Sequence, residues 1–223
     1  MIELRDVTYR YRRDASDVLS GVDLSLGAGT VTALLGPSGC GKSTMLYVCG
    51  LMLTPRSGEV LLDGQRVSGL SDHQRSRLRA RSIGFIFQDA MLDATRSVAD
   101  NVAEGAAFTT LPAPVIAERT ERLLEEFGVA DRAFARVADL SGGQAQRVAL
   151  CRALVKEPAV VLADEPSGNL DRTNGDLVID RLLAEAHGRG TTVLVVTHDE
   201  RLAQRCDTTV AFEELHGSAT PAA

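Results

Sequence analysis

The residues best suited to chemistry lie in the stretch GPSGCGKST, at positions 36–44. This stretch fits the spacing G-x-x-x-x-G-K-[ST], with Gly36, Gly41, Lys42 and Ser43 at the fixed positions. Glycine lets the backbone approach a ligand closely, and successive N–H groups at the start of a helix bind anions. We therefore expect a phosphate-binding loop, with Lys42 on the β- and γ-phosphates and the Ser43 hydroxyl on Mg²⁺.

The segments on either side of this loop favour that interpretation over an ordinary glycine-rich turn. Residues 31–35, VTALL, have the length and composition of a buried strand, and residues 42–52 suit a helix. A strand before the loop and a helix after it are the context in which this motif binds nucleotide. The motif alone leaves kinases, GTPases, motor ATPases and transport ATPases open.

A second candidate group is the acidic pair in AVVLADEP, where an apolar strand ends in Asp164 and Glu165. A carboxylate at the carboxyl end of a strand can hold the Mg²⁺ that Ser43 touches. The neighbouring Glu165 can orient or deprotonate an attacking water. Two carboxylates directly after a run of apolar residues need a cation or another partner, so we prefer these roles to an unpartnered surface pair.

A third candidate is LSGGQ, in which Ser141, Gly142 and Gly143 precede a helix with apolar residues at helical spacing. The start of this helix is a second anion site. A chain that already binds its phosphates once has no evident use for another such site. We therefore expect the second site to serve the nucleotide of a second copy of the chain.

The remaining chain alternates short apolar strands with helices, which predicts an α/β fold with a parallel sheet covered on both faces. The expected strands include residues 2–9, 83–87 and the apolar runs PAVVLADEP and TTVLVVTHD. The expected helices include residues 97–104, 113–127 and 173–187, and one that begins at 199. The last residues, from 216 on, are expected to be frayed.

Composition excludes several classes of protein. The 223 residues carry a net charge of −6, which makes nucleic acid an unexpected partner. No apolar run is long enough to span a bilayer, and the amino-terminal residues have no secretory signal. The four cysteines, Cys40, Cys49, Cys151 and Cys206, have no metal-ligand spacing and are expected to be reduced thiols.

Taken in order, the phosphate loop, LSGGQ, DEP, SGNLD and VTHD resemble the ATP-binding cassette (ABC) ATPases, from about residue 2 to about residue 212. The resemblance implies a P-loop NTPase fold: a RecA-like parallel sheet core with an antiparallel β subdomain and a helical signature subdomain. It implies one nucleotide-binding domain over 1–223. The core and β subdomain would take about 1–88 and 158–215, and the helical subdomain about 89–157.

The resemblance also implies roles for individual residues. Tyr11, or alternatively Tyr9, would stack on adenine; Gln88 would sense Mg²⁺ and nucleotide; Asp171 would link two ATP sites; and His198 would contact the γ-phosphate. The nucleotide-binding set implied on the phosphate loop and on LSGGQ is Gly36, Pro37, Ser38, Gly39, Cys40, Gly41, Lys42, Ser43, Thr44, Ser141, Gly142, Gly143 and Gln144. The other histidines, His73, His187 and His216, are expected to be ordinary surface residues.

The family resemblance implies ATP and Mg²⁺ as cofactors and a head-to-tail dimer of two copies. It implies an integral membrane permease that docks near residues 89–101 and holds the chain on the cytoplasmic face of the membrane. VLADEPSGNLD and GFIFQ are most similar to the subgroup of macrolide efflux, lipoprotein release, haem export and cell division. Export or extraction of a substrate is the first expectation, and a regulator that signals to a cell-wall hydrolase is the alternative. Arginine supplies nearly all basic residues, which suggests a high-GC source; a Gram-positive source of that kind would put haem, peptide or drug export ahead of lipoprotein release.

Overall fold

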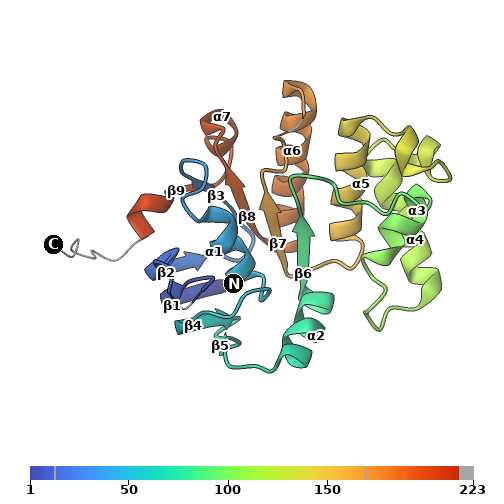
Figure 1. Cartoon of the computed structure of the whole chain (residues 1–223). Coiled ribbons are helices and arrows are strands. Elements are labelled where there is room, and N and C mark those ends of the chain that lie inside the picture. Colours follow the sequence, from blue (N-terminus) through green and yellow to red (C-terminus); the bar gives the residue numbers. More distant parts are fainter. Residues whose placement is uncertain (13, 169, 216–223) are drawn as a thin grey trace.

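A five-stranded parallel sheet, in the order β6-β7-β8-β3-β9, forms the centre of the protein (Figure 1). The structure is a computed structural model that describes residues 1–12, 14–168 and 170–215. The strands are β3 (Val31–Leu35), β6 (Ile83–Ile86), β7 (Val160–Asp164), β8 (Thr192–Thr197) and β9 (Thr208–Ala211). The parallel sheet expected from the sequence is confirmed.

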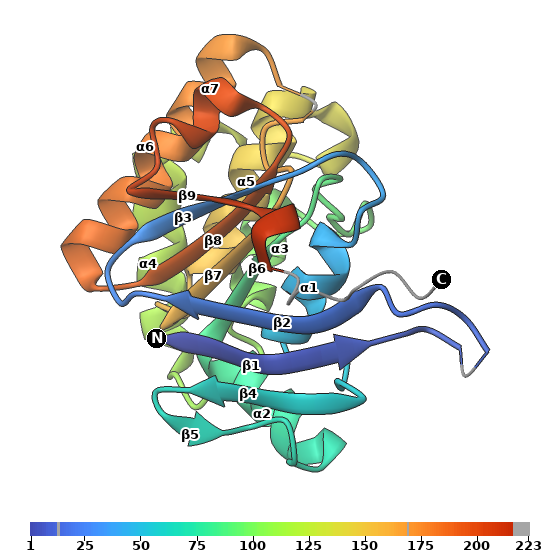
Figure 2. The same cartoon turned by 90° about the vertical axis from the view of Figure 1, so that its left-hand side faces the viewer.

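An antiparallel sheet, in the order β2-β1-β4-β5, packs below the parallel one (Figure 2). Its strands are β1 (Ile2–Tyr9), β2 (Leu19–Leu26), β4 (Ser57–Leu62) and β5 (Gln65–Arg66). Leu4 and Leu24 point from this sheet into the same apolar cluster as Leu46 of the first helix and Leu162 of β7. The two sheets and that helix therefore share one core.

Helices cover the parallel sheet on its two faces. They are α1 (Lys42–Cys49), α2 (Asp72–Ser82), α3 (Val98–Glu104), α4 (Ala113–Glu126), α5 (Gly142–Leu154), α6 (Arg172–Arg189) and α7 (Glu200–Ala203), with 3₁₀ turns η1 (Ala130–Arg132), η2 (Val137–Asp139) and η3 (Phe212–Leu215). Because side chains alternate along a strand, Val160 and Leu162 of β7 face α1 and the antiparallel sheet. Val161 and Ala163 face the cluster that α3 to α7 complete. Figure 1 shows α3, α4 and α5 gathered beyond β6, at one side of the molecule.

Two details differ from the sequence expectation. The helix after the phosphate loop ends at Cys49 and not at residue 52, because Gly50 caps it and Leu51 has a φ of 58°. The chain also adds a fifth parallel strand, β9, and the turn η3 after the last helix. The expected frayed tail from 216 lies outside the described residues.

The packing of α3 against α5 depends on Gly105, which follows α3. A Cβ placed on Gly105 would lie only 2.0 Å from the carbonyl oxygen of Arg152 in α5. The guanidinium of Arg152 also donates hydrogen bonds to the carbonyl oxygens of Met91, at 2.6 Å, and Ala90, at 2.8 Å. The close backbone approach at Gly105 thus fixes the position of the helix that begins with LSGGQ.

We expect Gly105→Ala to lower the free energy of unfolding by about 2–4 kcal/mol, because the added methyl group overlaps backbone that has no room to move. Gly188→Ala in α6 is the matched control, since nothing lies within 4 Å of its Cβ position. Alanine there should be neutral or stabilising by up to about 1 kcal/mol. Urea unfolding of both variants measures this, and equal stabilities would contradict the packing argument.

Candidate active site

The phosphate loop joins β3 to α1 and has the backbone that its glycines permit. Gly39 and Gly41 have φ values of 79° and 115°. The Lys42 ammonium lies over the loop and donates to the carbonyl oxygens of Gly36, at 2.7 Å, and Pro37, at 2.8 Å. Lys42 is buried, so its charge sits where backbone N–H groups at the start of α1 also favour an anion.

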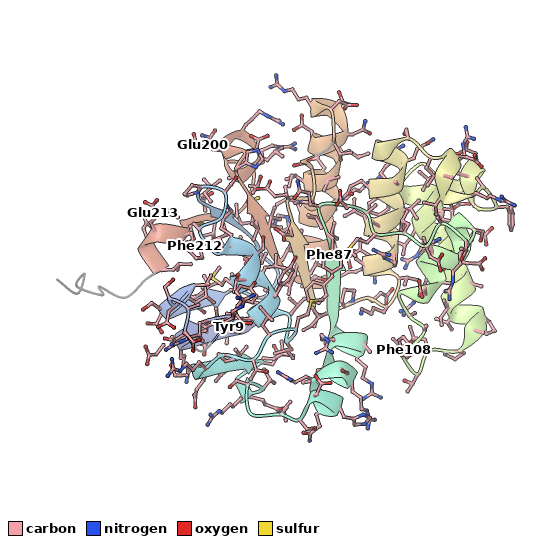
Figure 3. The ribbon with its side chains drawn as sticks, in the orientation of Figure 1. Tyr9, Phe87, Phe108, Glu200, Phe212 and Glu213 are labelled. Atoms are coloured by element: carbon pink, nitrogen blue, oxygen red, sulfur yellow. The ribbon has the colours of Figure 1, made fainter. Side chains whose placement is uncertain are left out.

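Phe212, from the carboxyl-terminal turn η3, packs under this loop (labelled in Figure 3). A Cβ on Gly36 would lie 3.1 Å from Cβ of Phe212, and one on Gly41 would lie 3.1 Å from its ring. The ring is only 2% exposed. The last described segment of the chain therefore supports the phosphate loop, a contact for which no local pattern in the sequence provides a signal.

Asp164, at the end of β7, faces the first turn of α1. The Ser43 hydroxyl donates to Oδ1 at 3.1 Å, and the Tyr47 hydroxyl donates to Oδ2 at 3.4 Å. Burial raises the pKa of the Asp164 carboxyl, while these hydrogen bonds act in the opposite direction. Tyr47 was not predicted, although it lies one helical turn after Ser43 and so on the same face.

The oxygen atoms of Ser43 and Asp164 fit a magnesium ion. Mg²⁺ prefers a few hard oxygen ligands and keeps water in the other positions. The buried carboxylate of Asp164 has hydroxyl neighbours, and the ammonium of Lys42 bonds to loop carbonyls instead of to it. A cation bound here would offset the cost of burying that charge.

Glu165 is held in a strained position beside His198. Its φ is 45°, which is rare for a residue with a side chain, and its N–H donates to the Val196 carbonyl of β8 at 2.9 Å. Its carboxylate accepts from Thr197 Oγ1 at 3.3 Å and lies 2.8 Å from Nδ1 of His198. The carboxylate and the imidazole, predicted separately, are thus in direct contact.

Gln88 follows β6 and lies near the turn after Glu165. A Cβ placed on Gly168 would lie 3.7 Å from Nε2 of Gln88 and 3.4 Å from the carbonyl oxygen of Glu165. The residue that was expected to sense the metal and the nucleotide is therefore close to the candidate base.

Tyr11 lies beside the phosphate loop, where a residue that stacks on adenine would have to be. Its hydroxyl is 3.0 Å from Oγ1 of Thr44, and its ring meets Tyr9 edge-on with centroids 5.1 Å apart. Tyr11 is 59% exposed, whereas Tyr9 packs against the core cluster. An exposed ring face is what stacking on a base needs, so Tyr11 fits the adenine role better than Tyr9.

LSGGQ begins α5, where Ser141 is the N-cap. The Ser141 hydroxyl accepts from the Gln144 N–H at 3.3 Å, and the Gln144 side chain accepts from the Ser141 N–H at 2.9 Å, which forms a capping box. In Figure 1, α5 and α1 lie on opposite sides of β7. Within the described chain, no hydrogen bond or ion pair joins residues 141–144 to residues 36–44.

Asp171 caps α6 and is linked to α5 through Asn174. It accepts from the Asn174 N–H at 2.9 Å and from its side-chain amide at 2.7 Å. These hydrogen bonds lower the pKa of the Asp171 carboxyl. Arg147 of α5 donates to the side-chain oxygen Oδ1 of Asn174 at 2.6 Å. Asp171 is therefore linked to helix α5, which begins with LSGGQ, within one chain.

The other histidines lie outside this arrangement. His187, in the last turn of α6, contacts the Asp207 carboxylate at 3.0 Å, and His73 is exposed on α2. His216 falls outside the described residues.

Comparison with known proteins identifies the family. Residues 19–168 match the family model described as ABC transporter. The chain belongs to the ABC transporter family. It is therefore an ABC ATPase that binds and hydrolyses ATP, as its sequence motifs predicted.

The lipoprotein-releasing system ATP-binding protein LolD of Roseobacter denitrificans is 40% identical over 96% of this chain and 95% of its own length. The uncharacterized ABC transporter ATP-binding protein YknY of Bacillus subtilis is 39% identical over 91% of this chain and 89% of its own. The dimeric post-hydrolysis structure of the cassette MJ0796, bound to ADP and Pi, superposes with a TM-score of 0.85. It is 32% identical and covers 95% of this chain and 94% of that one.

None of the helices in the described residues is both long and apolar enough to cross a bilayer.

We expect a maleimide to label Cys40 before the other thiols. Burial raises the pKa of Cys49 to about 12 and that of Cys206 to about 11, and it raises the pKa of Cys151 as well. Those three thiols remain protonated near neutral pH, and only the thiolate reacts quickly. Cys40 is partly exposed within the phosphate loop.

Peptide mass mapping after brief labelling identifies the modified residue. Mg-ATP should protect Cys40, and Cys40→Ser should keep its ATPase activity and resist inactivation. If Cys206 or Cys151 is labelled first, or if ATP gives no protection, Cys40 only fills space in the loop.

Proposed function

We propose that this ABC ATPase works as a head-to-tail dimer that encloses two ATP molecules and drives a separate membrane subunit. Each ATP would lie between the phosphate loop of one copy and residues 141–143 of the other. The position of α5 supports this proposal most directly, since its amino terminus lies away from the phosphate loop of its own chain.

Gly142 adds a second argument. It is exposed, its φ is not in the left-handed region, and nothing lies within 4 Å of its Cβ position. Its own chain therefore does not require glycine, which costs up to about 1 kcal/mol relative to alanine within a helix. Glycine here suits the close approach of a phosphate group bound by a second copy.

Each residue of the candidate site would have its own part in ATP hydrolysis. Lys42 and the loop N–H groups would hold the phosphates, and Ser43, Asp164 and Gln88 would hold Mg²⁺, which offsets phosphate charge when bound. Glu165 would accept a proton from the attacking water, with its carboxylate oriented by Thr197. His198 would turn from Glu165 toward the γ-phosphate once ATP is bound.

We expect Glu165→Gln to bind ATP and dimerise, with ATP hydrolysis reduced by about 10²–10⁴-fold, the usual contribution of a positioned base. The amide keeps the shape of the carboxylate but cannot take the proton. Steady-state ATPase assays and binding of a fluorescent nucleotide check both parts. Lys42→Ala is the comparison, because it should weaken binding itself. Near-normal hydrolysis by Glu165→Gln would remove it from the base role.

Mixing two inactive variants tests whether the sites are shared between copies. Ser141→Arg should block the site whose phosphate loop belongs to the other copy, while Lys42→Ala blocks its own loop. In a mixed dimer, one site carries both defects and the other carries none. We expect about a quarter of wild-type activity after random mixing, if the sites act independently. No recovery would mean that each substitution acts within its own copy.

We propose that the membrane subunit docks in an apolar groove of about 500 Å³ between α2 and the loop after α3. Met91 and Phe108, which line it, are 66% and 86% exposed, and Phe108 is labelled in Figure 3. Such exposed apolar side chains mark interaction sites. The groove also includes Met52 and Lys156, so this docking site extends beyond the predicted 89–101. Burial lowers the pKa of Lys156 to about 8.

We expect Phe108→Glu combined with Met91→Glu to abolish co-purification with the membrane subunit encoded by the neighbouring gene, while ATP binding is retained. Two carboxylates in the groove would remain unpaired against an apolar partner surface. Phe134→Glu is the matched control, because Phe134 is 94% exposed but lines a different cavity. Equal loss in both variants would contradict docking in this groove.

We propose lipoprotein extraction as the first substrate class to test. The expectation from the arginine-rich composition placed haem, peptide and drug export ahead of it, but several of the relatives found are named for lipoprotein release. The membrane subunit reconstituted in vesicles with this chain should release a triacylated lipoprotein only with ATP. Release of a haem or drug substrate instead would replace this class. ATP turnover that activates a cell-wall hydrolase, with no substrate moved, would favour the regulatory alternative.

A further inference from the structure

Helix α2 carries a concentration of positive charge that the ATPase reaction does not use. It has four arginines against one aspartate, in a chain whose net charge is −6. No residue of the helix is buried. A basic helix on an acidic protein marks a place where a negatively charged surface can approach.

Two of the four arginines are engaged within the chain. Arg75 contacts Thr54 and Asp72, and Arg79 donates to the Leu51 carbonyl oxygen at 2.6 Å. These bonds attach α2 to the segment after α1. The other two arginines of α2, Arg77 and Arg81, take no part in these bonds.

Arg77 and Arg81 are exposed, and in the described part of the chain neither side chain makes a hydrogen bond or an ion pair. They lie one helical turn apart, so both guanidinium groups project from one face. Arg66 of β5 lies beside them across a shared cavity and pairs with Glu59 at 3.1 Å. Two full positive charges therefore remain unneutralised on this face.

The three arginines surround a cavity of about 490 Å³ between α2 and the β4–β5 hairpin. Apolar side chains (Leu62, Val67, Leu70 and Leu78) and polar ones (Gln65, Gln74 and Ser82) also line it. The one carboxylate among the lining residues, Asp63, is paired with the amino-terminal ammonium at 2.8 Å. The lining thus combines apolar side chains with arginines, which suits an anionic group that is attached to an apolar body.

The position of this cavity indicates what reaches it. Ser76, Arg79 and Ala80, on the other side of α2, line the groove in which we place the membrane subunit. Figures 1 and 2 show α2 and β5 together at one end of the molecule, opposite α7. This step rests on the proposed membrane partner: with that partner in the groove, the basic face of α2 is held beside the bilayer.

We propose that Arg66, Arg77 and Arg81 bind the phosphate headgroups of anionic lipids. Guanidinium groups match phosphate oxygens with two parallel hydrogen bonds. Each basic residue near an anionic bilayer adds to the attraction, and salt weakens it. The contact orients an otherwise acidic protein with α2 toward the membrane.

The test compares binding of the purified full-length chain to two kinds of vesicle, phosphatidylcholine alone and phosphatidylcholine with phosphatidylglycerol. Arg77→Glu/Arg81→Glu is the test variant. The control is Arg132→Glu/Arg136→Glu, which makes the same change of net charge at exposed positions elsewhere. Basal ATPase activity should be unchanged in both, which shows that they are folded.

We expect the wild type and the control to sediment with the anionic vesicles at low salt, and the test variant to lose at least tenfold in partitioning. Equal loss in the control would overturn the proposal, because it would mean that net charge alone decides binding. Absence of wild-type binding to anionic vesicles would also overturn it, and co-purification with the membrane subunit would then show that the proposed function stands.

A photo-reactive residue in place of Gln74, in the complex with the membrane subunit, separates lipid from protein. Crosslinks to phosphatidylglycerol support the proposal. Crosslinks only to an acidic segment of the partner overturn it in favour of a protein contact. Protection of Arg77 and Arg81 from phenylglyoxal by inorganic phosphate, without protection by anionic vesicles, would overturn it in favour of a free anion.

Discussion

The register of the parallel sheet is the constraint on which the site depends. Leu35 of β3 lies opposite Thr197 of β8, and Asp164 of β7 lies opposite Val196. Because the carboxyl ends of parallel strands share one edge, the phosphate loop, the acidic pair, His198 and Gln88 all emerge there. A shift of one residue in β7 would turn Asp164 toward the other face of the sheet. The side chains of β7 point alternately into the two apolar clusters. The packing that sets the register of β7 therefore also sets the direction of the Asp164 carboxylate.

Much of this arrangement could be predicted from the sequence, because the motifs are local. The phosphate loop, the caps of α5 and α6, and the strand that ends in Asp164 are each specified by neighbouring residues. Phe212, Tyr47 and the strand β9 were not found, since their roles depend on contacts between segments far apart in the chain. The early end of α1 was missed because Leu51 adopts a left-handed backbone that apolar spacing does not reveal. The roles given to the individual site residues remain predictions.

Two features of the folded chain bear on the proposed reaction. Glu165 holds a strained backbone, with a φ of 45°, beside His198. Such strain persists only where the surrounding structure imposes it, and here the strand β8 does so through the Val196 carbonyl. The amino terminus of α5, by contrast, is open: Gly142 is exposed, and nothing lies within 4 Å of its Cβ position. The link from Arg147 to Asn174 and Asp171 would let this open end respond to events at a second nucleotide.

The dependence of ATPase activity on protein concentration tests the shared site most directly. If two copies enclose each ATP, the rate per copy must rise with concentration while monomers predominate, and level off once dimers form. Light scattering on the same samples should show the mass doubling from 23.8 kDa over the same range. A rate per copy that stays constant down to concentrations where only monomer is present would contradict the account.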